Sequence, residues 1–282
     1  MMSDSSKTYL LVGTVTKDLL PGDTFTIGGT VTYASTVVQN LGWQPVIVTR
    51  ATPDFRPPPH LAAADWHILP STEMTTFRNE YFPEGRLQTI GPIADAINPT
   101  DIPPRYRTIK LVHICPLAQD VAPEITDVFA DSLLFSTPQG WLRQWDDRGI
   151  VSLGGWQKME PILPRLNAAV ISIEDVEGDW SIVERWAPHV PILVVTQGET
   201  GCTIFYKNQR IVVPPRPANP TDLTGAGDVF AAAFFIRYFE TRDIWQAGRF
   251  ANVTASMAIE LPGVAGAPTR NEVEAYLAEH PV

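Results

Sequence analysis

The sequence predicts an α/β fold in which a central, mostly parallel sheet is covered by helices on both faces. Short apolar runs of strand length alternate with helical stretches along nearly all of the 282 residues, as in sheets built from strand–helix–strand units. Residues 229–239 are almost entirely apolar, with Arg237 as the one charge, and a helix that is apolar all round is a buried helix. No repeat, low-complexity stretch or long linker divides the sequence, so we expect a single domain over residues 1–282.

The strands are predicted from apolar runs that end at turn residues. In chain order these runs lie at 9–12, 45–49, 111–115, 133–136, 168–173, 191–196, 202–206 and 210–214. Helices are predicted at 28–42, 123–130, 229–239, 246–259 and 269–279, the last with Thr269 as its N-cap. Residues 75–82 and 86–90 alternate polar and apolar around Pro83-Glu84-Gly85, which indicates a hairpin.

Composition and charge exclude several classes of partner. The formal net charge of −10 argues against nucleic acid and anionic membranes, although backbone amides can still bind a phosphate within a negative protein. Cys115 and Cys202 lie in apolar runs without metal-ligand spacing, so we expect buried free thiols in a reducing compartment. The polar start of the sequence, residues 1–7, does not resemble a signal peptide, and no apolar run reaches the length of a membrane span. A cytoplasmic protein is expected.

The stretch 221–230, Thr-Asp-Leu-Thr-Gly-Ala-Gly-Asp-Val-Phe, leads into the buried helix. Its glycines allow a ligand to approach the backbone closely. We expect the amides of Gly225, Ala226, Gly227 and Asp228 to point out of the helix end and form an anion site. The helix dipole should keep Asp228 ionised, and a carboxylate there can take the proton of an acceptor hydroxyl during phosphoryl transfer. The alternative interpretation is that Asp228 is only an N-cap residue after a tight turn. For the short motif alone, the two interpretations are equally well supported.

A second set of polar residues follows the first predicted strand. Asp18 lies just beyond its carboxyl end, where open α/β sheets bind ligands. From position alone a surface turn is the better interpretation of this acid. The Gly28-Gly29 pair before the next helix also permits close backbone approach.

The longer string Asp-x-Thr-Gly-Ala-Gly-Asp-x-Phe at 222–230 resembles the second signature of the ribokinase-like (PfkB) carbohydrate kinases, and 28–42 resembles the first. The resemblance implies a three-layer fold with a small β lid, here from about 14–30 and 70–92, and it implies ATP and Mg²⁺. Carried over to this sequence, Asp228 is the base and Gly225, Ala226 and Gly227 form the anion hole. The implied acceptor-binding residues are Asp18, Gly28, Gly29, Gln139 and Asp228, and the implied nucleotide-binding residues are Thr196, Gly198, Gly201, Asp222, Thr224 and Asn252.

The sequence departs from the family at two places. Where the family has Asn-x-x-Glu beside Mg²⁺, this chain has Ser172 to Asp175, so Asp175 is the expected equivalent, with Glu174 as a second candidate. Where the family often has an Asp-x-Asn-x-x-x-Arg-like segment lining the cleft, this chain has residues 137–143: Thr137 replaces the Asp, Gln139 lies near the Asn position, and Arg143 stands at the Arg position. The competing interpretation of this segment is a capped helix start with a solvent-facing Arg143. A monovalent cation beside Asp222 is left open.

Segments around 75–82, 101–103 and 194–202 resemble the myo-inositol kinases of plants within the family. This favours a cyclitol, sugar or similar polyol as acceptor. A nucleoside stays an alternative, because Phe77, Tyr81 and Phe82 could line the lid. A non-catalytic ligand-binding or regulatory protein is the alternative from another class; the altered Asn-x-x-Glu favours it, and the intact Asp222 and Asp228 oppose it. A monomer and a homodimer are both compatible with the sequence.

Overall fold

The computed structural model describes residues 7–22, 24–82 and 85–281, and its largest element is a nine-stranded sheet. The strand order is β15-β14-β13-β12-β9-β8-β1-β4-β5; β14 is antiparallel to both of its neighbours, β13 and β15, and the remaining neighbours are parallel. The strands are β1 (Thr8–Val12), β4 (Gln44–Ala51), β5 (Asp65–Pro70), β8 (Leu111–Ile114), β9 (Leu133–Ser136), β12 (Ala168–Ser172), β13 (Ile192–Thr196), β14 (Cys202–Tyr206) and β15 (Gln209–Val213). The α/β class and the mostly parallel sheet predicted from the sequence are confirmed.

The central strands are buried on both faces, which explains why they are continuous apolar runs rather than alternating ones. Side chains alternate across a strand, so Tyr9 and Leu11 of β1 join one apolar core, whereas Leu10 and Val12 join the other. The first core also contains helices α1, α4 and α5. The second contains α3 (Trp180–Trp186) and a series of short 3₁₀ turns.

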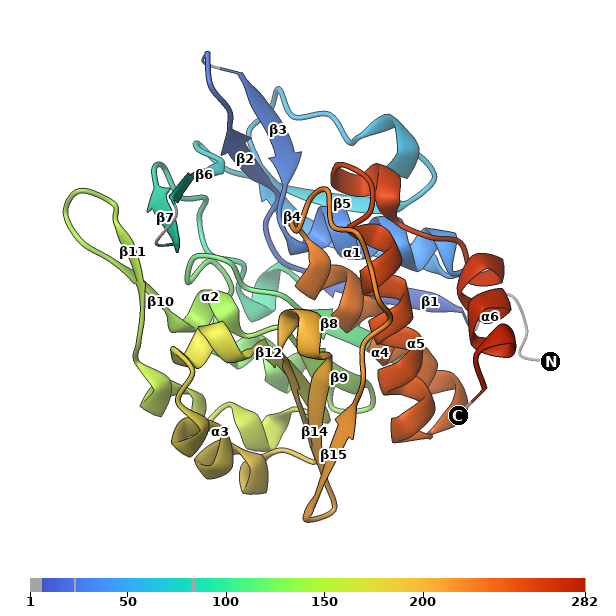
Figure 1. Cartoon of the computed structure of the whole chain (residues 1–282). Coiled ribbons are helices and arrows are strands. Elements are labelled where there is room, and N and C mark those ends of the chain that lie inside the picture. Colours follow the sequence, from blue (N-terminus) through green and yellow to red (C-terminus); the bar gives the residue numbers. More distant parts are fainter. Residues whose placement is uncertain (1–6, 23, 83–84, 282) are drawn as a thin grey trace.

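Three helices stack on the first face, beside the sheet in Figure 1. They are α1 (Thr30–Asn40), α4 (Ala226–Thr241) and α5 (Ile244–Ala258), and α6 (Arg270–Glu279) packs against α5. Residues 229–236 of α4 are all buried, which confirms the expected core helix. Thr269 caps α6 by accepting a hydrogen bond from the amide of Glu272, as predicted.

A smaller four-stranded sheet lies at one edge of the molecule, at the upper left of Figure 1. Its order is β3-β2-β6-β7, with β2 (Thr16–Leu19), β3 (Phe25–Gly28), β6 (Thr75–Phe82) and β7 (Gly85–Ile90). Its strands come from the segments 14–30 and 70–92, which the resemblance assigned to a lid. The hairpin of β6 and β7 forms as expected, but part of its predicted turn, Pro83 and Glu84, lies outside the described residues.

A short hairpin of β10 (Arg143–Trp145) and β11 (Val151–Leu153) joins the small sheet to the body. It follows the short helix α2 (Gln139–Leu142). The amide of Ile90, the last residue of β7, donates to the carbonyl of Gly149 at 2.8 Å, and Thr89 pairs with Ile150. The hairpin turn therefore extends the small sheet beyond β7.

Several elements differ from the sequence-based prediction. Strand β5, helix α3 and the hairpin of β10 and β11 were not predicted, and residues 123–129 form a 3₁₀ helix rather than an α-helix. Asp18 lies on strand β2 and not in an irregular exit from β1. All of these are short or edge elements, whose apolar patterns are too brief to separate from a loop.

The two cysteines, Cys115 and Cys202, are buried and free, as expected. Among the described helices, none combines the length and the apolarity that a membrane crossing needs.

The sheet has one point where the chain changes direction. From β1 the chain continues to β4 on one side, and it later returns to β8 on the other. In open α/β sheets a ligand site forms beyond the carboxyl ends of the strands at such a switch point. The fold thus directs attention to the residues that follow β1, β8, β9 and β12.

Candidate active site

The N-termini of helices α1 and α4 meet above this switch point. Gly225 is the N-cap of α4 with φ of 78°, and a Cβ there would lie 2.3 Å from the ring of Tyr33 in α1. The glycine is therefore required both by the left-handed backbone and by close helix packing. Asp228 lies in the first turn of α4, three residues inside the helix. The alternative interpretation of Asp228 as the N-cap residue is wrong.

The backbone amides at the start of α4 form a partial anion site. In this described stretch, the amides of Gly225, Gly227 and Asp228 meet no backbone or side-chain acceptor, and a Cβ on Gly227 would find open space within 4 Å. The amide of Ala226 instead donates to the carbonyl of Leu223 at 3.2 Å. The predicted contribution of Ala226 to the anion site is thus wrong for this conformation, because the turn itself uses that amide.

Asp222 organises the loop before α4. One carboxylate oxygen accepts from the amide of Thr224 at 2.9 Å and the other from Gly263 at 2.8 Å. Burial works to raise the pKa of Asp222, but the hydrogen bonds from Thr224 and Gly263 outweigh it and lower the pKa overall. Asp222 therefore fastens the 263–266 turn to the helix start, and Thr224 lies exposed on the same loop.

Asp18 and Gly28 are in direct contact across the small sheet. Thr16 pairs with Gly28 where β2 and β3 meet, and the Thr16 hydroxyl donates to Asp18 at 3.1 Å. A Cβ on Gly28 would lie 2.0 Å from the Asp18 carboxylate. Gly29 is the N-cap of α1 with φ of 89°, and it lies against the backbone of Thr14. The two glycines thus make room for the carboxylate beside the helix end.

Asp228 is the carboxylate whose titration is most clearly shifted. Burial raises its pKa to about 6, while a hydrogen bond from the Thr30 side chain and the positive charge of Arg143 oppose the rise, and Asp18 and Asp175 add to it. The helix dipole alone predicts an ionised carboxylate at Asp228. The structure instead indicates a carboxylate that is mostly ionised at pH 7 and still able to accept a proton, which suits a general base.

Arg143, at the end of the segment that the resemblance places along the cleft, is buried. Only 6% of the residue is exposed, and it donates to the carbonyl of Leu117 at 2.9 Å and to Oε1 of Gln139 at 2.7 Å. Its guanidinium carbon lies 5.0 Å from the ring centre of Phe77 in the small sheet. The interpretation of Arg143 as solvent-facing is wrong. The spacing of Thr137, Gln139 and Arg143, which resembles the Asp-x-Asn-x-x-x-Arg segment of the family, was the signal in the sequence.

Gln139 and Asp175, which the sequence analysis placed near the cleft, are hydrogen-bonded to each other. Nε2 of Gln139 donates to one carboxylate oxygen of Asp175 at 2.7 Å, and the amide of Ser172 donates to the other at 2.8 Å. Burial raises the pKa of Asp175, against the hydrogen bonds from Ser172 and Gln139. Glu174 beside it is exposed. Asp175 thus has both oxygens engaged, whereas Glu174 is open to a bound ion.

The predicted nucleotide side lies across the sheet from Asp18. Thr196 and Ser172 pair at the ends of β13 and β12, and the following turn contains Gly198 with φ of 55° and Gly201 with φ of 89°. Asn252 in α5 is buried, and its Nδ2 donates to the carbonyls of Val213 and Pro214, both at 3.0 Å. The amide nitrogen of Asn252 therefore anchors the end of β15 in this structure.

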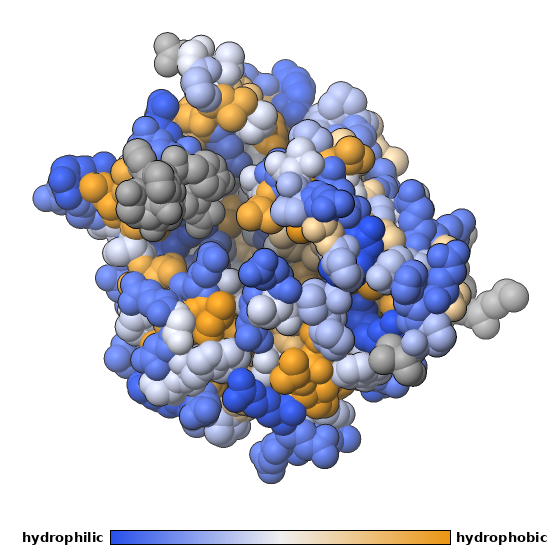
Figure 2. Space-filling view, in the orientation of Figure 1, coloured by the Kyte–Doolittle hydropathy of each residue, from blue (hydrophilic) through white to orange (hydrophobic). Residues whose placement is uncertain are grey.

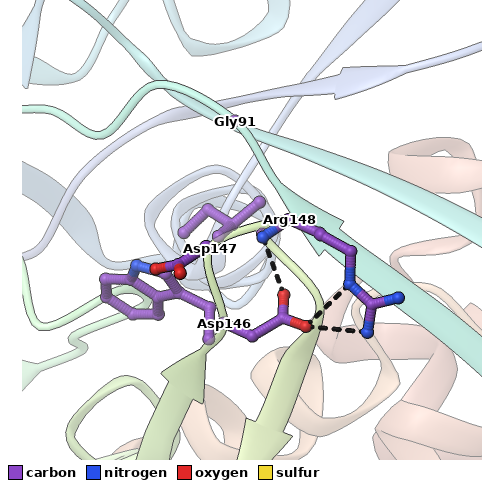
Figure 3. A pocket seen from close by; sticks show the side chains of 7 residues that line it. Gly91, Asp146, Asp147 and Arg148 are labelled. Carbon is purple, nitrogen blue, oxygen red and sulfur yellow. Dashed lines mark hydrogen bonds and ion pairs between the residues drawn. The ribbon is translucent and has the colours of Figure 1, made fainter.

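No three His, Cys, Asp or Glu side chains of the described chain converge into a ready-made metal site. The face in Figure 2 is hollowed near its centre, below the small sheet. A separate pocket lies beside Gly91 and the turn of the β10–β11 hairpin, where Asp146 and Arg148 pair with each other (Figure 3). None of the residues lining that pocket belongs to the carboxylate cluster.

Residues 181–270 match the family described as pfkB family carbohydrate kinase. The chain is 40% identical to the ribokinase of Bacillus subtilis over 99 residues, which span 35% of this chain and 34% of that protein. It is 28% identical to the inositol 3-kinase of Arabidopsis thaliana over 252 residues, or 83% of this chain and 68% of that protein. The strongest of these sequence matches thus spans about a third of the curated relative.

Among solved structures, the chain is similar to a pyrophosphate-dependent kinase in the ribokinase family complexed with a pyrophosphate analog and myo-inositol. The TM-score is 0.78 at 20% sequence identity, over 95% of this chain and 99% of that one. At this identity the likeness establishes the fold, which is that of the ribokinase family.

Proposed function

We propose that the chain, whose residues 181–270 match the pfkB family carbohydrate kinases, transfers a phosphoryl group from ATP to a hydroxyl of a small sugar or polyol. The observation that supports this best is Asp228, a carboxylate with a pKa raised to about 6 in the first turn of α4. It lies beside open backbone amides that can hold a transferring phosphoryl group. A base and an anion site that share one helix end are the two groups that the reaction requires.

In the proposed reaction the acceptor lies between Asp18 and Asp228. Asp18 accepts a hydrogen bond from one hydroxyl and fixes the orientation of the ring. Asp228 accepts the hydrogen bond of the reacting hydroxyl and takes its proton as the new bond to phosphorus forms. The amides of Gly225, Gly227 and Asp228 hold the negative charge of the group in transfer. A hydrogen bond from the Thr30 side chain and the positive charge of Arg143 both favour the ionised form of Asp228.

The residues present fit a hydrated Mg²⁺ carried by the donor phosphates. Magnesium keeps several waters and needs one or two carboxylates from the protein. Glu174 is exposed at the end of β12 and can contact its waters, whereas both oxygens of Asp175 are already hydrogen-bonded. We therefore assign the outer metal contact to Glu174 and an orienting role to Asp175. When bound, the ion would neutralise charge on the donor phosphates.

For the acceptor we favour a cyclitol such as myo-inositol. The support is the similarity to the Arabidopsis inositol 3-kinase over most of the chain and to a solved kinase structure that holds myo-inositol. Because that solved enzyme is described as pyrophosphate-dependent, pyrophosphate must be tested as a donor beside ATP.

Thr196, Gly198 and Gly201 would contact the donor phosphates, with Asn252 behind them.

The nucleoside alternative receives less support. It depends on aromatic side chains that could stack on a base, and Phe77 is only 4% exposed and packs against Arg143. The side chains of Tyr81 and Phe82 lie outside what the structure describes. Phe77 therefore borders the site, and its ring is not open for a nucleoside base to stack on.

The function is tested by measuring phosphate transfer from Mg-ATP and from Mg-pyrophosphate to a panel of cyclitols, sugars and nucleosides. We expect ATP-dependent activity on a cyclitol. Activity with pyrophosphate alone would correct the donor and keep the chemistry, and activity on a nucleoside alone would correct the acceptor. Binding of a donor and an acceptor without any transfer would favour the regulatory alternative.

Asp228→Asn is the first catalytic variant to make. The amide cannot take a proton, so we expect kcat to fall by about 10²–10⁴-fold. Donor binding, measured by calorimetry, should change little, because the backbone amides and the loop held by Asp222 are untouched. Retention of most of the rate would show that another group is the base.

A further inference from the structure

The stretch that leads into helix α4 has no regular structure of its own. Residues 214–225, all of them described, join β15 to α4 without forming a helix or a strand, and they contain four prolines. Proline supplies no amide for a hydrogen bond. The last residues of the stretch, Asp222, Thr224 and Gly225, belong to the proposed donor site. Contacts with other elements must therefore hold this stretch in position.

Glu260, just after the end of α5, holds the middle of the stretch. Its two carboxylate oxygens accept hydrogen bonds from the two Nη atoms of Arg216 at 3.0 and 3.1 Å. Oε1 also accepts from the amide of Asn219 at 3.3 Å, and the carbonyl of Glu260 accepts from the Thr221 hydroxyl at 3.1 Å. One residue thus fastens the stretch at three positions.

These contacts continue as far as the anion site. The carbonyl of Ile259, the residue before Glu260, accepts from the amide of Thr221 at 2.7 Å and from that of Asp222 at 3.1 Å. The Asp222 carboxylate then accepts from the amide of Thr224 at 2.9 Å, one residue before the N-cap of α4. A series of hydrogen bonds therefore connects the end of α5 to the start of α4.

The ion pair of Arg216 and Glu260 has a well-defined geometry. The guanidinium fork engages both carboxylate oxygens, which is the stronger form of this contact. The same guanidinium lies 5.3 Å from the ring centre of Tyr276 in α6, and its hydrogen bonds lower the pKa of Glu260. The two side chains are 17% and 30% exposed, and a partly exposed ion pair adds little to global stability. Its effect is therefore expected mainly in the stretch that it fastens.

We propose that Arg216 and Glu260 are positioning residues for the phosphoryl donor. Their ion pair keeps residues 219–225 in the conformation that presents the amides of α4 to the donor phosphates, so the donor site is preorganised. The acceptor residues Asp18 and Gly28 come from β2 and β3, so their positions do not depend on this ion pair. The proposal rests on the proposed function for the identity of the donor.

The test compares binding of donor and acceptor. Glu260→Gln removes the negative charge at nearly constant size, and Arg216→Met removes the guanidinium. Each variant should weaken binding of Mg-ATP or Mg-pyrophosphate, measured by calorimetry, about tenfold, with unchanged affinity for myo-inositol. The double variant should be no worse than the weaker single variant, because both changes remove the same contact. Arg216→Lys keeps the charge without the fork, so an intermediate loss is expected.

Asp101→Asn is the matched control. Asp101 also accepts from an arginine, Arg50, at 2.9 Å and from a backbone amide, that of Asn98, at 2.8 Å, and its side chain is 21% exposed. The turn that it fastens lies beside β4, close to the edge of the sheet opposite β15. Loss of this ion pair should leave donor binding unchanged.

Amide hydrogen exchange of residues 219–224 is measured on the same samples. Faster exchange in Glu260→Gln than in the wild type and in Asp101→Asn, together with a selective loss of donor affinity, upholds the proposal. Unchanged exchange, or equal losses of donor and myo-inositol affinity, would overturn it and leave a structural ion pair. If the wild type binds neither donor while exchange still rises in Glu260→Gln, the proposed function fails, whereas the fastening of the stretch by Glu260 is upheld.

Discussion

At the scale of single residues, the site depends on how closely a backbone can approach a carboxylate. Gly28 has no positive φ and so could hold an alanine without backbone strain, yet a Cβ would lie 2.0 Å from Asp18. The glycine is required by the neighbouring acid and not by its own conformation. This separates it from Gly29, whose φ of 89° requires glycine in any case.

Gly28→Ala is therefore expected to displace Asp18 and to weaken the acceptor site selectively. We expect kcat/KM for the acceptor to fall on the order of 100-fold, as for other displacements of about 1 Å, with little change in the KM for the donor. Gly91→Ala is the matched control, because a Cβ there meets only ordinary contacts at 3.7 Å or more. Steady-state kinetics on both substrates measure the effect. Equal losses for donor and acceptor would contradict a selective role.

At the scale of elements, the first turn of α4 combines two glycines with opposite requirements. Gly225 has a left-handed backbone and touches the ring of Tyr33, whereas Gly227 has an ordinary helical backbone and open space beside it. Within a helix, glycine is less stable than alanine by up to about 1 kcal/mol. The open glycine thus lowers stability for no packing reason, which is expected where a ligand must approach the backbone.

The two alanine substitutions should therefore change the free energy of unfolding in opposite directions. Gly225→Ala should lower the free energy of unfolding by about 2–4 kcal/mol, from left-handed strain and the overlap with Tyr33. Gly227→Ala should leave stability equal or raise it by up to about 1 kcal/mol, while its methyl group obstructs the anion site and lowers kcat/KM by about 10²-fold. Denaturant unfolding and kinetics on the same samples test both. A Gly227→Ala variant with full activity would exclude the anion site from this turn.

Some features of these elements could be predicted from the sequence, and others could not. The α4 signature, the central strands and the pair Gly28–Gly29 were predictable, because apolar periodicity and glycine chemistry are local properties. The sequence left a cleft-lining and a solvent-facing Arg143 equally supported, because its burial depends on the loop at Leu117 and on Phe77 in a sheet formed by distant segments. The amide of Ala226 is engaged by a local turn hydrogen bond to Leu223, which the glycine pattern alone does not specify. The side-chain amide of Asn252 is engaged by a tertiary contact with the end of β15.

At the scale of the whole molecule, the middle of the sheet contains a polar group with no access to water. His113 on β8 is fully buried. Its Nδ1 lies 3.1 Å from the hydroxyl of Tyr9 on β1, and its Nε2 lies 3.0 Å from that of Thr137 after β9. Both contacts are satisfied when Tyr9 donates to the neutral ring and the ring donates to Thr137. His113 also packs edge-on against Phe235 of α4, so it links β1, β8 and the residue after β9 to the central helix.

Burial lowers the pKa of His113 to about 3, against an ordinary value of 6.5. The unfolded chain therefore binds a proton at this histidine as pH falls below 6.5, while the folded chain does not until about pH 3. The contribution of His113 to stability is intact above pH 6.5 and is lost progressively between 6.5 and 3. The loss amounts to as much as about 1.4 kcal/mol per pH unit in that interval.

Asp228 acts in the opposite direction over part of the same range. Its pKa is raised to about 6 in the folded protein, so the folded state gains relative stability as pH falls from 6 towards 3.8. In the wild-type protein the effects of His113 and Asp228 on the pH dependence of stability would partly cancel. They are separated by measuring His113 in the Asp228→Asn background, where the second titration is absent.

We therefore expect His113→Gln to flatten the acid side of the stability curve. Glutamine does not titrate, and its amide can still donate to Thr137, so the variant should be less stable than its parent at pH 8 because the packing against Phe235 is imperfect. From pH 6.5 down to 4 the difference should shrink, by up to about 1.4 kcal/mol per pH unit, and it can change sign. Urea unfolding of Asp228→Asn and Asp228→Asn/His113→Gln at several pH values measures this difference, in which all other titrating groups cancel. Parallel curves would show that His113 becomes charged inside the folded protein, with Tyr9 and Thr137 rearranging to accept its protons.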